Sequence, residues 1–396
     1  MITVDEAARI ILATATPIAP VECALREAHG RILRSDVRAD RPAPPFDRVM
    51  MDGIAIRFDE WREGHREFAV QAAVRAGVAP PECRARCAIE VMTGGVLPPG
   101  CDTVIPVEWT ERHGDRVRLT DSEPRAATLQ RGAFVHPCGV DGAAGRTVLA
   151  AGVRLGPCEL AVAATEGAVT LHVNRVPRVC IVTTGDEVVP ADTQPEPWQI
   201  RGSHAVALEA LLAEHGAVHC SNRHARDDDD DLRAALGKAL DGYDVLLVTG
   251  GVSMGRWDRV PAVLGEVGVE KRFHTVAQRP GKPMWFGTRG STVVFGLPGN
   301  PLSALACARR YVVPWLDHFR GATLPVTRRV RCQVRNDSAM TTFHSVVMRG
   351  ESVELLSPRN SGDLHALVGS DGLVECPPSN GQAADGLLSF YAWRTP

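Results

Sequence analysis

The sequence predicts a multidomain protein in which an α/β domain with a parallel sheet is combined with β-rich domains. The chain has 396 residues, which is enough for about two to four domains. Strand-like and helix-like segments alternate between residues 177 and 322, a pattern typical of βαβ units around a parallel sheet. On both sides of this stretch, short apolar runs separated by Gly and Pro predict β structure.

In the central stretch, short apolar runs predict the strands, and apolar residues spaced at a helical period predict the helices. The predicted strands are residues 178–183, 218–222, 244–248 and 292–295. The predicted helices are residues 203–215, 231–240, 259–267 and 301–316. The alternation ends at about residue 324, and the apolar runs that follow predict a small all-β C-terminal domain.

The N-terminal part of the chain begins with a predicted helix. Thr3 and Glu6 have the spacing of a capping box, which predicts a helix that continues to about Ala15. Residues 36–60 are rich in Pro, Asp and Arg and are predicted as loop. Residues from about 65 to 175 alternate in short runs and predict one or two small β-rich domains.

Charge and hydropathy argue against a nucleic-acid-binding or membrane protein. The 44 Lys and Arg residues are nearly balanced by 47 Asp and Glu, and no basic block is interleaved with aromatic residues. No apolar run approaches the roughly 20 residues of a membrane span. Asp5 and Glu6 lie where a signal peptide carries positive charge, so we expect a soluble cytoplasmic protein.

The 11 cysteines are scattered between Cys23 and Cys376 without a CxxC pair. The closest spacing, Cys83-x3-Cys87 with Cys101 further along, is compatible with a metal site. An odd number of scattered cysteines is more typical of free thiols in a reducing compartment, and this is the interpretation we favour.

Three predicted strands are followed by turns rich in Gly, Thr and Pro. Ligands of parallel α/β sheets bind beyond the carboxyl ends of the strands, where glycine lets the backbone approach a ligand and helix N-termini attract anions. Each turn alone is also typical of a strand–helix connection without a ligand, but three in one sheet favour a binding site. The candidate residues in these turns are Thr184, Gly185, Gly250, Gly251, Ser253, Pro298, Gly299, Asn300 and Pro301.

Carboxylates and cations accompany these turns. Asp186, Glu187 and Asp258 lie in or near them, and together with the turns they indicate a phosphorylated ligand bridged by a divalent cation. The run of aspartates at 227–231 is typical of a helix start. The exception is Asp227 or Asp228, one of which we expect to belong to the binding site. In the segment 279–283, Arg279 and Lys282 each precede a proline. The segment is either an ordinary surface turn or a clamp that binds an oxyanion, and its place between two of the glycine-rich turns favours the clamp.

In the N-terminal half, the Asp-Gly at 52–53 and the Thr-Gly at 93–94 are ordinary turn sequences when judged by chemistry alone. Together with the rest of the chain they are more informative. The sequence resembles the molybdopterin molybdenumtransferase family, which includes MoeA and the E domain of gephyrin, over essentially its full length. The matching stretches are PPFDRVMMDG, EVMTGGVLPPGCDTVIPVE, GVDGAAGRTVLAAGVRLGP, VPRVCIVTTGDEVV, LLVTGGVSMGRWDRV, RPGKPMWFG and FGLPGNPLSA.

The resemblance implies four domains. They are an elongated domain from residues 1–44 and 140–175, a β-rich insert at 45–139, the α/β molybdopterin-binding domain at 176–322, and a C-terminal β-barrel at 323–396. It also implies a homodimer whose active site combines the α/β domain of one chain with the N-terminal regions of the other. The implied reaction is insertion of molybdate into adenylylated molybdopterin, assisted by Mg²⁺, with release of AMP and formation of molybdenum cofactor. An upstream adenylyltransferase and downstream molybdoenzymes are the protein partners implied.

The resemblance also implies roles for individual residues. Glu187, Asp228 and Asp258 would hold the metal, while Asp52, Thr93 and Asp141 match further catalytic motifs, the first two reaching in from the partner chain. The backbone of Thr184–Gly185, Gly250–Gly251 and Pro298–Asn300 would bind the nucleotide and phosphates. The molybdate oxyanion would be bound by Ser253, Arg279, Lys282, Ser303 and Ser361.

Several positions depart from the family's motifs, which places substrate identity in question more than fold. In this chain, residues 48–50 stand where the motif has Asn-Ser-Ala, and residues 201–203 stand where it has Asp-Ser/Thr-Asn. The single positions, with the motif's residue in parentheses, are Ile54 (Tyr), His136 (Arg), Val140 (Glu), Thr275 (Lys), Arg279 (Lys) and Ser345 (Arg). The alternatives to an active molybdenum insertase are a divergent paralogue specific for tungstate or for one client enzyme, and a non-catalytic scaffold. A stand-alone adenylyltransferase is disfavoured because such enzymes lack the N-terminal and C-terminal regions.

Overall fold

The computed structural model describes residues 1–120, 128–216, 218–253, 255, 258–323, 327–358, 360, 362–378 and 383–394. The chain forms two compact units. The larger unit comprises Met1–Ser35, Ala151–Leu160 and Val169–Pro396, and the smaller unit comprises Asp36–Ala150 and Ala161–Ala168. The division into four domains stays a prediction. Among the described helices, none has the length and apolar character needed to cross a membrane.

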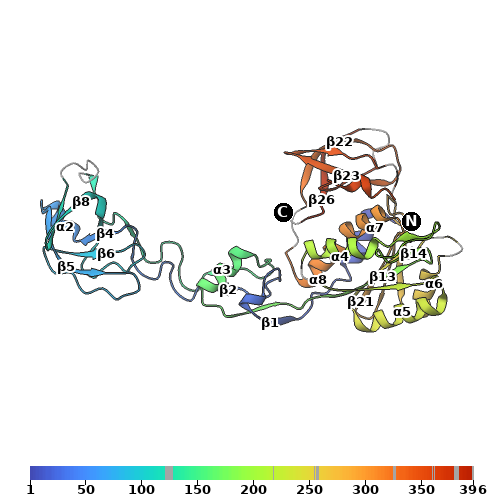
Figure 1. Ribbon diagram of the computed structural model, residues 1–396, viewed down its shortest axis with the longest axis horizontal. Coiled ribbons are helices and arrows are strands. Elements are labelled where there is room, and N and C mark those ends of the chain that lie inside the picture. The colour runs from blue at the N-terminus through green and yellow to red at the C-terminus, as the bar shows by residue number, and fades with distance from the viewer. Residues whose placement is uncertain are drawn as a thin grey trace. The chain divides into compact units, whose positions relative to one another are not determined.

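A six-stranded sheet forms the centre of the larger unit, in the order β16-β13-β17-β21-β20-β18 (Figure 1). The first four strands are parallel and confirm the four strand predictions: β16 His219–Ala225, β13 Arg178–Thr184, β17 Val245–Thr249 and β21 Thr292–Leu297. The prediction omitted two antiparallel strands at one edge, β20 Trp285–Arg289 and β18 Glu270–His274. The sheet is therefore mixed.

Helices cover both faces of this sheet, because alternate side chains of its buried strands point to opposite faces. On one face Ile181, Leu247 and Phe295 pack with the helices of one apolar cluster. On the other face Val182 and Val248 pack with those of a second cluster. The first face is covered by α1 Val4–Leu12, α4 His204–Glu214, α7 Pro301–Cys307, a π-helical turn Ala308–Val312 and α8 Val313–Arg320. The second face is covered by α5 Asp229–Gly242 and α6 Val260–Glu266.

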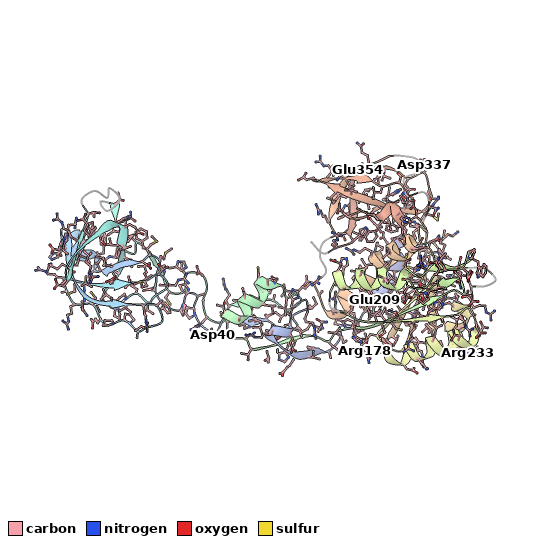
Figure 2. All side chains as sticks on the ribbon, in the orientation of Figure 1. Asp40, Arg178, Glu209, Arg233, Asp337 and Glu354 are labelled. Carbon is pink, nitrogen blue, oxygen red and sulfur yellow. The ribbon has the colours of Figure 1, made fainter. Side chains whose placement is uncertain are left out.

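The helix predictions are confirmed in place, with shifts at the ends. Thr3 and Glu6 form the capping box, in which the Glu6 N–H donates to Thr3 Oγ1 at 3.2 Å and the Thr3 N–H donates to Glu6 Oε2 at 2.8 Å. Helix α1 ends at Leu12 rather than near Ala15, and the Thr14 hydroxyl donates to the Ile11 carbonyl. Arg233 of α5 lies on the outer surface (Figure 2). It forms an ion pair with Glu266 of α6 at 2.7 Å.

The C-terminal strands close into a five-stranded barrel, as predicted. Each strand pairs with the next in the cycle β23-β24-β22-β26-β25, and β25 returns to β23. One short strand from the α/β segment, β19 Gln278–Arg279, adds in parallel to β23, with Gln278 opposite Thr341. This pairing fixes the barrel beside the sheet. The barrel strands are β22 Arg329–Arg335, β23 Thr341–Arg349, β24 Ser352–Leu355, β25 Gly372–Cys376 and β26 Ala383–Ala392.

The smaller unit contains a second six-stranded sheet, in the order β7-β4-β6-β5-β9-β8. Its strands are β4 Gly53–Ile56, β5 Glu67–Val74, β6 Cys87–Val91, β7 Thr103–Pro106, β8 Thr110–His113 and β9 Arg116–Leu119. Two short pairs accompany it: β3 Arg48–Val49 with β10 Val135–His136, and β2 Val37–Arg38 with β11 Thr147–Leu149.

The prediction of loop for residues 36–60 is wrong, because β2, β3, β4 and the start of α2 Phe58–Arg62 lie there. The local density of Pro, Asp and Arg concealed β4, which is buried along its whole length and pairs with β6 and β7. Gly53 begins this strand, and a Cβ at that position would lie 1.9 Å from the Ile105 carbonyl oxygen. Only glycine allows the two strands to approach this closely.

The remaining elements flank the two sheets. β1 Pro20–Ala24 pairs with β12 Thr170–Asn174, and β14 Val188–Val189 pairs with β15 Ile200–Arg201. α3 Pro157–Thr165 is the further α-helix among the described residues.

Candidate functional site

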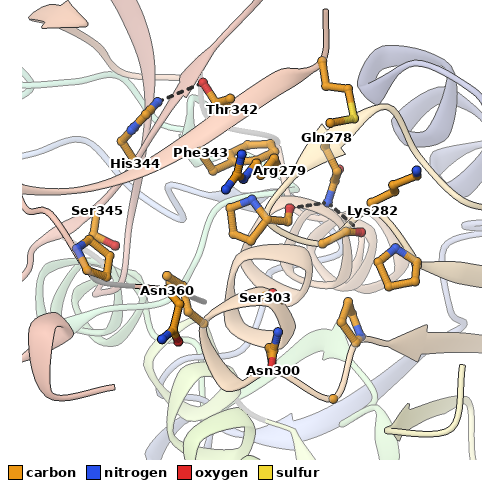
Figure 3. Close-up of a pocket in the computed structure, with 18 of the residues that line it drawn as sticks. Gln278, Arg279, Lys282, Asn300, Ser303, Thr342, Phe343, His344, Ser345 and Asn360 are labelled. Carbon is orange, nitrogen blue, oxygen red and sulfur yellow. Dashed lines mark hydrogen bonds between the residues drawn. The ribbon is translucent and has the colours of Figure 1, made fainter. Parts of the chain in front are cut away.

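A cavity of about 940 Å³ lies between the α/β segment and the barrel of the larger unit (Figure 3). Its α/β side contains many of the predicted site residues: Gly251, Ser253, Asp258, Arg279, Lys282, Pro298, Gly299, Asn300 and Ser303. Its barrel side is formed mainly by β23 and by the segment that follows β24, with Thr342, Phe343, His344, Ser345, Leu355, Leu356 and Pro358. The barrel side was not predicted from the residue chemistry, except that the family comparison singled out position 345.

The three glycine-rich turns meet at the carboxyl edge of the sheet. The Thr184 hydroxyl donates to the Thr249 carbonyl at 3.3 Å, and the Gly250 N–H donates to the Leu297 carbonyl at 3.3 Å. Gly250 has a φ of +89°, and a Cβ on it would lie 2.7 Å from Thr184 Oγ1. The turns can therefore pack this closely only with glycine at this position, and the predicted convergence of the strand ends is confirmed.

The stretch 298–301 connects β21 to α7. Asn300 is the N-cap residue of α7, and Pro301 occupies the first turn, where its missing N–H costs no hydrogen bond. Ser303 lies in the same turn, is 3% exposed and lines the cavity. The turn thus presents backbone groups and one hydroxyl-bearing residue at the cavity.

Gln278 holds the turn that carries the two cations. Its side chain is 1% exposed, and its Nε2 lies 3.3 Å from the carbonyl oxygens of both Pro280 and Gly281. The Tyr311 hydroxyl donates to Gln278 Oε1 from the other side. Arg279 and Lys282, which follow on this turn, are exposed and line the cavity. Sequence reasoning missed Gln278 and Tyr311, since nothing in their local pattern separates them from ordinary core residues.

Two of the predicted metal-binding carboxylates have hydrogen bonds within their own loops. Asp258 Oδ2 accepts the Gly255 N–H at 2.6 Å while Asp258 lines the cavity. Asp228 is the N-cap of α5 and accepts the N–H groups of Asp230 and Asp231 at 3.1 Å each. Asp228 therefore performs the ordinary role of an aspartate at a helix start.

Asp227, rather than Asp228, faces the acidic turn after β13. Its N–H donates to Asp186 Oδ1 at 3.3 Å. Burial raises the pKa of Asp227 above its usual value, and the carboxylates of Asp186 and Glu187 raise it further. No three His, Cys, Asp or Glu side chains within the described residues converge as a preformed metal site.

These acidic residues nevertheless fit the chemistry of Mg²⁺. Magnesium commonly binds one or two carboxylates and completes its coordination with water and substrate phosphates, so a preformed cage is not needed. Burial is the largest cause of the raised pKa of Asp227, and the negative charges of Asp186 and Glu187, which a divalent cation would offset, raise it further. The donor set is therefore compatible with the predicted ion.

The remaining predicted catalytic residues lie in the smaller unit. Asp52 Oδ1 accepts both the N–H and the hydroxyl of Thr93, at 2.7 Å each. These hydrogen bonds lower the pKa of Asp52 and keep it ionised. Asp141 instead pairs with His136, with 2.9 Å between Oδ2 and Nε2.

One position at which the family motif is absent has a clear structural setting. Ser345 is 2% exposed, and its Oγ has no hydrogen-bond partner among the described residues. Burial lowers the pKa of the neighbouring His344, whose Nε2 lies 2.8 Å from Thr342 Oγ1. A neutral imidazole and a serine therefore line the barrel side of the cavity, whereas Arg279 and Lys282 provide positive charge on the α/β side. Ser361 lies outside the described residues.

A cavity with two cations, at the edge of a sheet with three glycine-rich turns and beside carboxylates, has the features of a site for an anionic, phosphorylated ligand. The comparisons with known proteins agree. Residues 2–167 match the family described as "MoeA N-terminal region (domain I and II)", and residues 180–318 match the "Probable molybdopterin binding domain".

Relatives match over most of the chain. The molybdopterin molybdenumtransferase of Synechocystis is 34% identical over 398 residues, covering 99% of this chain and 100% of the relative. That of Bacillus subtilis is 33% identical over 318 residues, covering 79% of this chain and 74% of the relative. A solved structure of a molybdopterin biosynthesis MoeA protein from Pyrococcus horikoshii superposes with a TM-score of 0.80 at 26% identity, covering 98% and 99% of the two chains. The chain belongs to the molybdopterin molybdenumtransferase family, a family of transferases.

Proposed function

We propose that this protein inserts molybdate into adenylylated molybdopterin, releasing AMP and forming molybdenum cofactor. The observation that carries the proposal is the cavity itself, which is lined by Arg279 and Lys282 together with Pro298–Asn300 and Ser303. Family membership supplies the reaction, and the cavity supplies the charge that an oxyanion substrate needs.

The oxyanion and the phosphates would bind to different parts of this edge. Lys282 and Arg279 would form charge-assisted hydrogen bonds with molybdate, together with Ser253, Ser303 and the predicted Ser361. The backbone of Thr184–Gly185, Gly250–Gly251 and Pro298–Asn300 would bind the nucleotide and pyrophosphate. This division would bring the bond to be cleaved next to the acidic turn.

Glu187 and Asp258 would hold Mg²⁺, with Asp186 and Asp227 as the further carboxylates favoured by the contacts around β13. Bound Mg²⁺ would neutralise charge that develops on the pyrophosphate during cleavage. The Asp258 carboxylate accepts the Gly255 N–H and is therefore held in place before the ligand binds. Asp228, as the N-cap of α5, would act by positioning this helix start.

Asp52 and Thr93, with Asp141, would complete the site from a second copy of the chain in a homodimer. The lowered pKa of Asp52 supports this role, since an ionised carboxylate is ready to orient a cation. A cytoplasmic location, an upstream adenylyltransferase and downstream molybdoenzymes complete the proposal. The four domains implied by the resemblance are part of the same proposal.

The positions at which the motif residues are absent favour one alternative, a paralogue with changed oxyanion or client preference. Ser345 replaces a cation of the motif with a neutral hydroxyl on the cavity wall. Fewer positive charges weaken the binding of any dianion. A non-catalytic molybdopterin-binding scaffold is the other alternative, and the retained Glu187, Asp258, Asp52 and Thr93 argue against it.

The test is molybdate-dependent release of AMP from adenylylated molybdopterin with Mg²⁺, repeated with tungstate. Release with molybdate is the expected result, and release only with tungstate would support the divergent paralogue. Tight binding without release would support the scaffold. Lys282→Gln should raise the molybdate concentration needed for half-maximal rate, whereas Lys271→Gln, an exposed lysine on β18 away from the cavity lining, should not.

A further inference from the structure

The π-helical turn Ala308–Val312, between α7 and α8, carries two adjacent side chains that bond to different parts of the larger unit. The Tyr311 hydroxyl donates to Gln278, whose amide holds the turn with the two cations. Arg310 instead reaches the barrel, where its Nε lies 2.8 Å from Glu375 Oε2. π-Helical turns are rare, and they are frequent at functional sites. This one is bonded to the turn that lines one side of the cavity and to the barrel that lines the other.

The ion pair between Arg310 and Glu375 is largely buried, with side chains that are 13% and 16% exposed. The Tyr391 hydroxyl donates to the same carboxylate oxygen at 2.7 Å. The guanidinium carbon of Arg310 lies 5.3 Å from the centre of the Tyr391 ring and 5.4 Å from that of the Tyr311 ring. Removing one member of such a pair leaves a buried charge without its partner, which costs far more than breaking an ion pair at the surface.

Glu375 is one strand away from the barrel side of the cavity. It lies on β25 opposite Phe343 of β23, and Phe343 lines the cavity. Two residues earlier on β25, Leu373 lies opposite the cavity-lining Ser345 and packs with Leu302 of α7. The described residues that line the cavity include neither member of the ion pair. A shift of β25 would therefore move the barrel side of the cavity although the ion pair itself is outside the lining.

We propose that Arg310 and Glu375 are positioning residues that hold the barrel side of the cavity at the distance from the α/β side that the bound ligand requires. This inference rests on the proposed function, since it concerns how tightly the same cavity binds molybdate. A cavity side that is already held in place needs no ordering when the ligand arrives, whereas a loosened one must be ordered at the expense of affinity.

The size of the effect follows from the fraction of molecules whose cavity is correctly closed. The apparent dissociation constant rises in inverse proportion to this fraction. If loss of the ion pair reduces the fraction to about one tenth, the molybdate concentration needed for half-maximal binding rises about ten-fold. The chemical step in the molecules that have bound ligand is expected to change little.

Two variants remove the ion pair, and two others serve as controls. Arg310→Met and Glu375→Gln both preserve side-chain length, and Glu375→Gln keeps an oxygen acceptor, so it keeps the test valid if Arg310→Met fails to fold. The matched control is Arg349→Met, which breaks an ion pair with Glu354 on the barrel surface at 3.1 Å, where both side chains are 62% exposed. Leu388→Ala controls for lost stability, because Leu388 packs in the barrel core.

Hydrogen exchange of the full chain without ligand is the first measurement. The Thr341 N–H donates to the Ala277 carbonyl at 3.0 Å where β19 joins the barrel, so its exchange reports on opening between the two sides. Arg310→Met and Glu375→Gln should each speed this exchange by about ten-fold or more, whereas Arg349→Met should not. Unchanged exchange in both ion-pair variants would overturn the proposal, whatever the activity of the protein.

The second measurement is AMP release at varied molybdate concentration, together with equilibrium dialysis of molybdate alone. Both ion-pair variants should show a KM for molybdate about ten-fold higher, with kcat within about two-fold of the wild type. A purely structural loss reduces the amount of folded protein, so Leu388→Ala should lower the maximal rate and leave KM unchanged. If the wild type binds molybdate but releases no AMP, the proposed function fails, and dialysis still compares the variants. Equal molybdate affinity in the wild type and the ion-pair variants, or a wild type that binds no molybdate, would overturn the positioning role.

Discussion

Gln278 supports the cation-bearing turn of the cavity, and its replacement by methionine tests how that turn is held. Methionine has a similar length and no amide, so the change removes the hydrogen bonds and keeps most of the volume. The amide lies 3.3 Å from each of two carbonyls and from Cys307 Sγ, and it accepts from Tyr311.

The expected cost follows from the burial of these groups. Gln278 and Tyr311 are each 1% exposed, so the Tyr311 hydroxyl would lose its acceptor without access to water. An unsatisfied buried group costs about 1–3 kcal/mol, and the two long bonds to carbonyls add less. Gln278→Met should therefore lower the free energy of unfolding of the larger unit by about 2–4 kcal/mol. Tyr311→Phe should cost about 1–2 kcal/mol.

Urea unfolding measures these costs, and hydrogen exchange at Met284 measures the turn itself, because its N–H donates to the Gly281 carbonyl. The double variant should cost less than the sum of the two single variants, since no unpaired partner remains. Molybdate binding should weaken with Gln278→Met, because Arg279 and Lys282 lose their fixed support. Unchanged unfolding and exchange in Gln278→Met, or strictly additive costs, would refute the reasoning.

Four further results are expected. Asp258→Ala should abolish AMP release while leaving urea unfolding unchanged, and near wild-type activity would contradict its assignment to the metal. Ser345→Ala should leave stability unchanged or slightly higher, because the lost hydroxyl has no partner among the described residues; a clear loss of stability in thermal unfolding would show a missed contact. Thr93→Val should shift the acidic limb of the rate–pH profile to slightly higher pH, because the hydroxyl hydrogen bond that helps to lower the pKa of Asp52 is lost while the bond from the N–H of residue 93 remains; an unshifted limb would argue against an ionised Asp52 in catalysis. Burial lowers the pKa of His215 from 6.5 to about 4. As the pH drops from 6.5 to 4, the unfolded state therefore binds the proton first, and the free energy of unfolding falls by up to about 3 kcal/mol. His215→Gln should flatten this pH dependence in urea titrations at several pH values, and an unchanged slope would exclude His215 as its source.

The larger features of the fold could be predicted because their signals are local. Three of the four parallel strands, β13, β17 and β21, are buried over nearly their whole length, so each is an apolar run that can be recognised without knowing its neighbours. Turns with Gly and Pro at the ends of these runs marked the edge of the sheet where a ligand binds. The capping box at Thr3 and Glu6 is equally local, since both of its hydrogen bonds span three residues.

The features that were missed depend on contacts between distant segments. β4 lies in a stretch rich in Pro and Asp, and it is a strand because β6 and β7 pair with it and bury it. Strands β18 and β20 are defined by their antiparallel pairing at the sheet edge, which a local pattern does not specify. Their residues alone do not distinguish them from loops.

The same distinction applies to the site. Composition and motif order were enough to indicate an anionic ligand, the carboxylates and the cations at positions 279 and 282. Which carboxylate faces the acidic turn depends on where α5 begins: Asp228 becomes the cap, and its neighbour Asp227 is left beside Asp186. Gln278 and Tyr311 became visible only when β19 joined the barrel and enclosed the cavity, because their roles depend on burial and on a hydrogen bond between residues 33 positions apart.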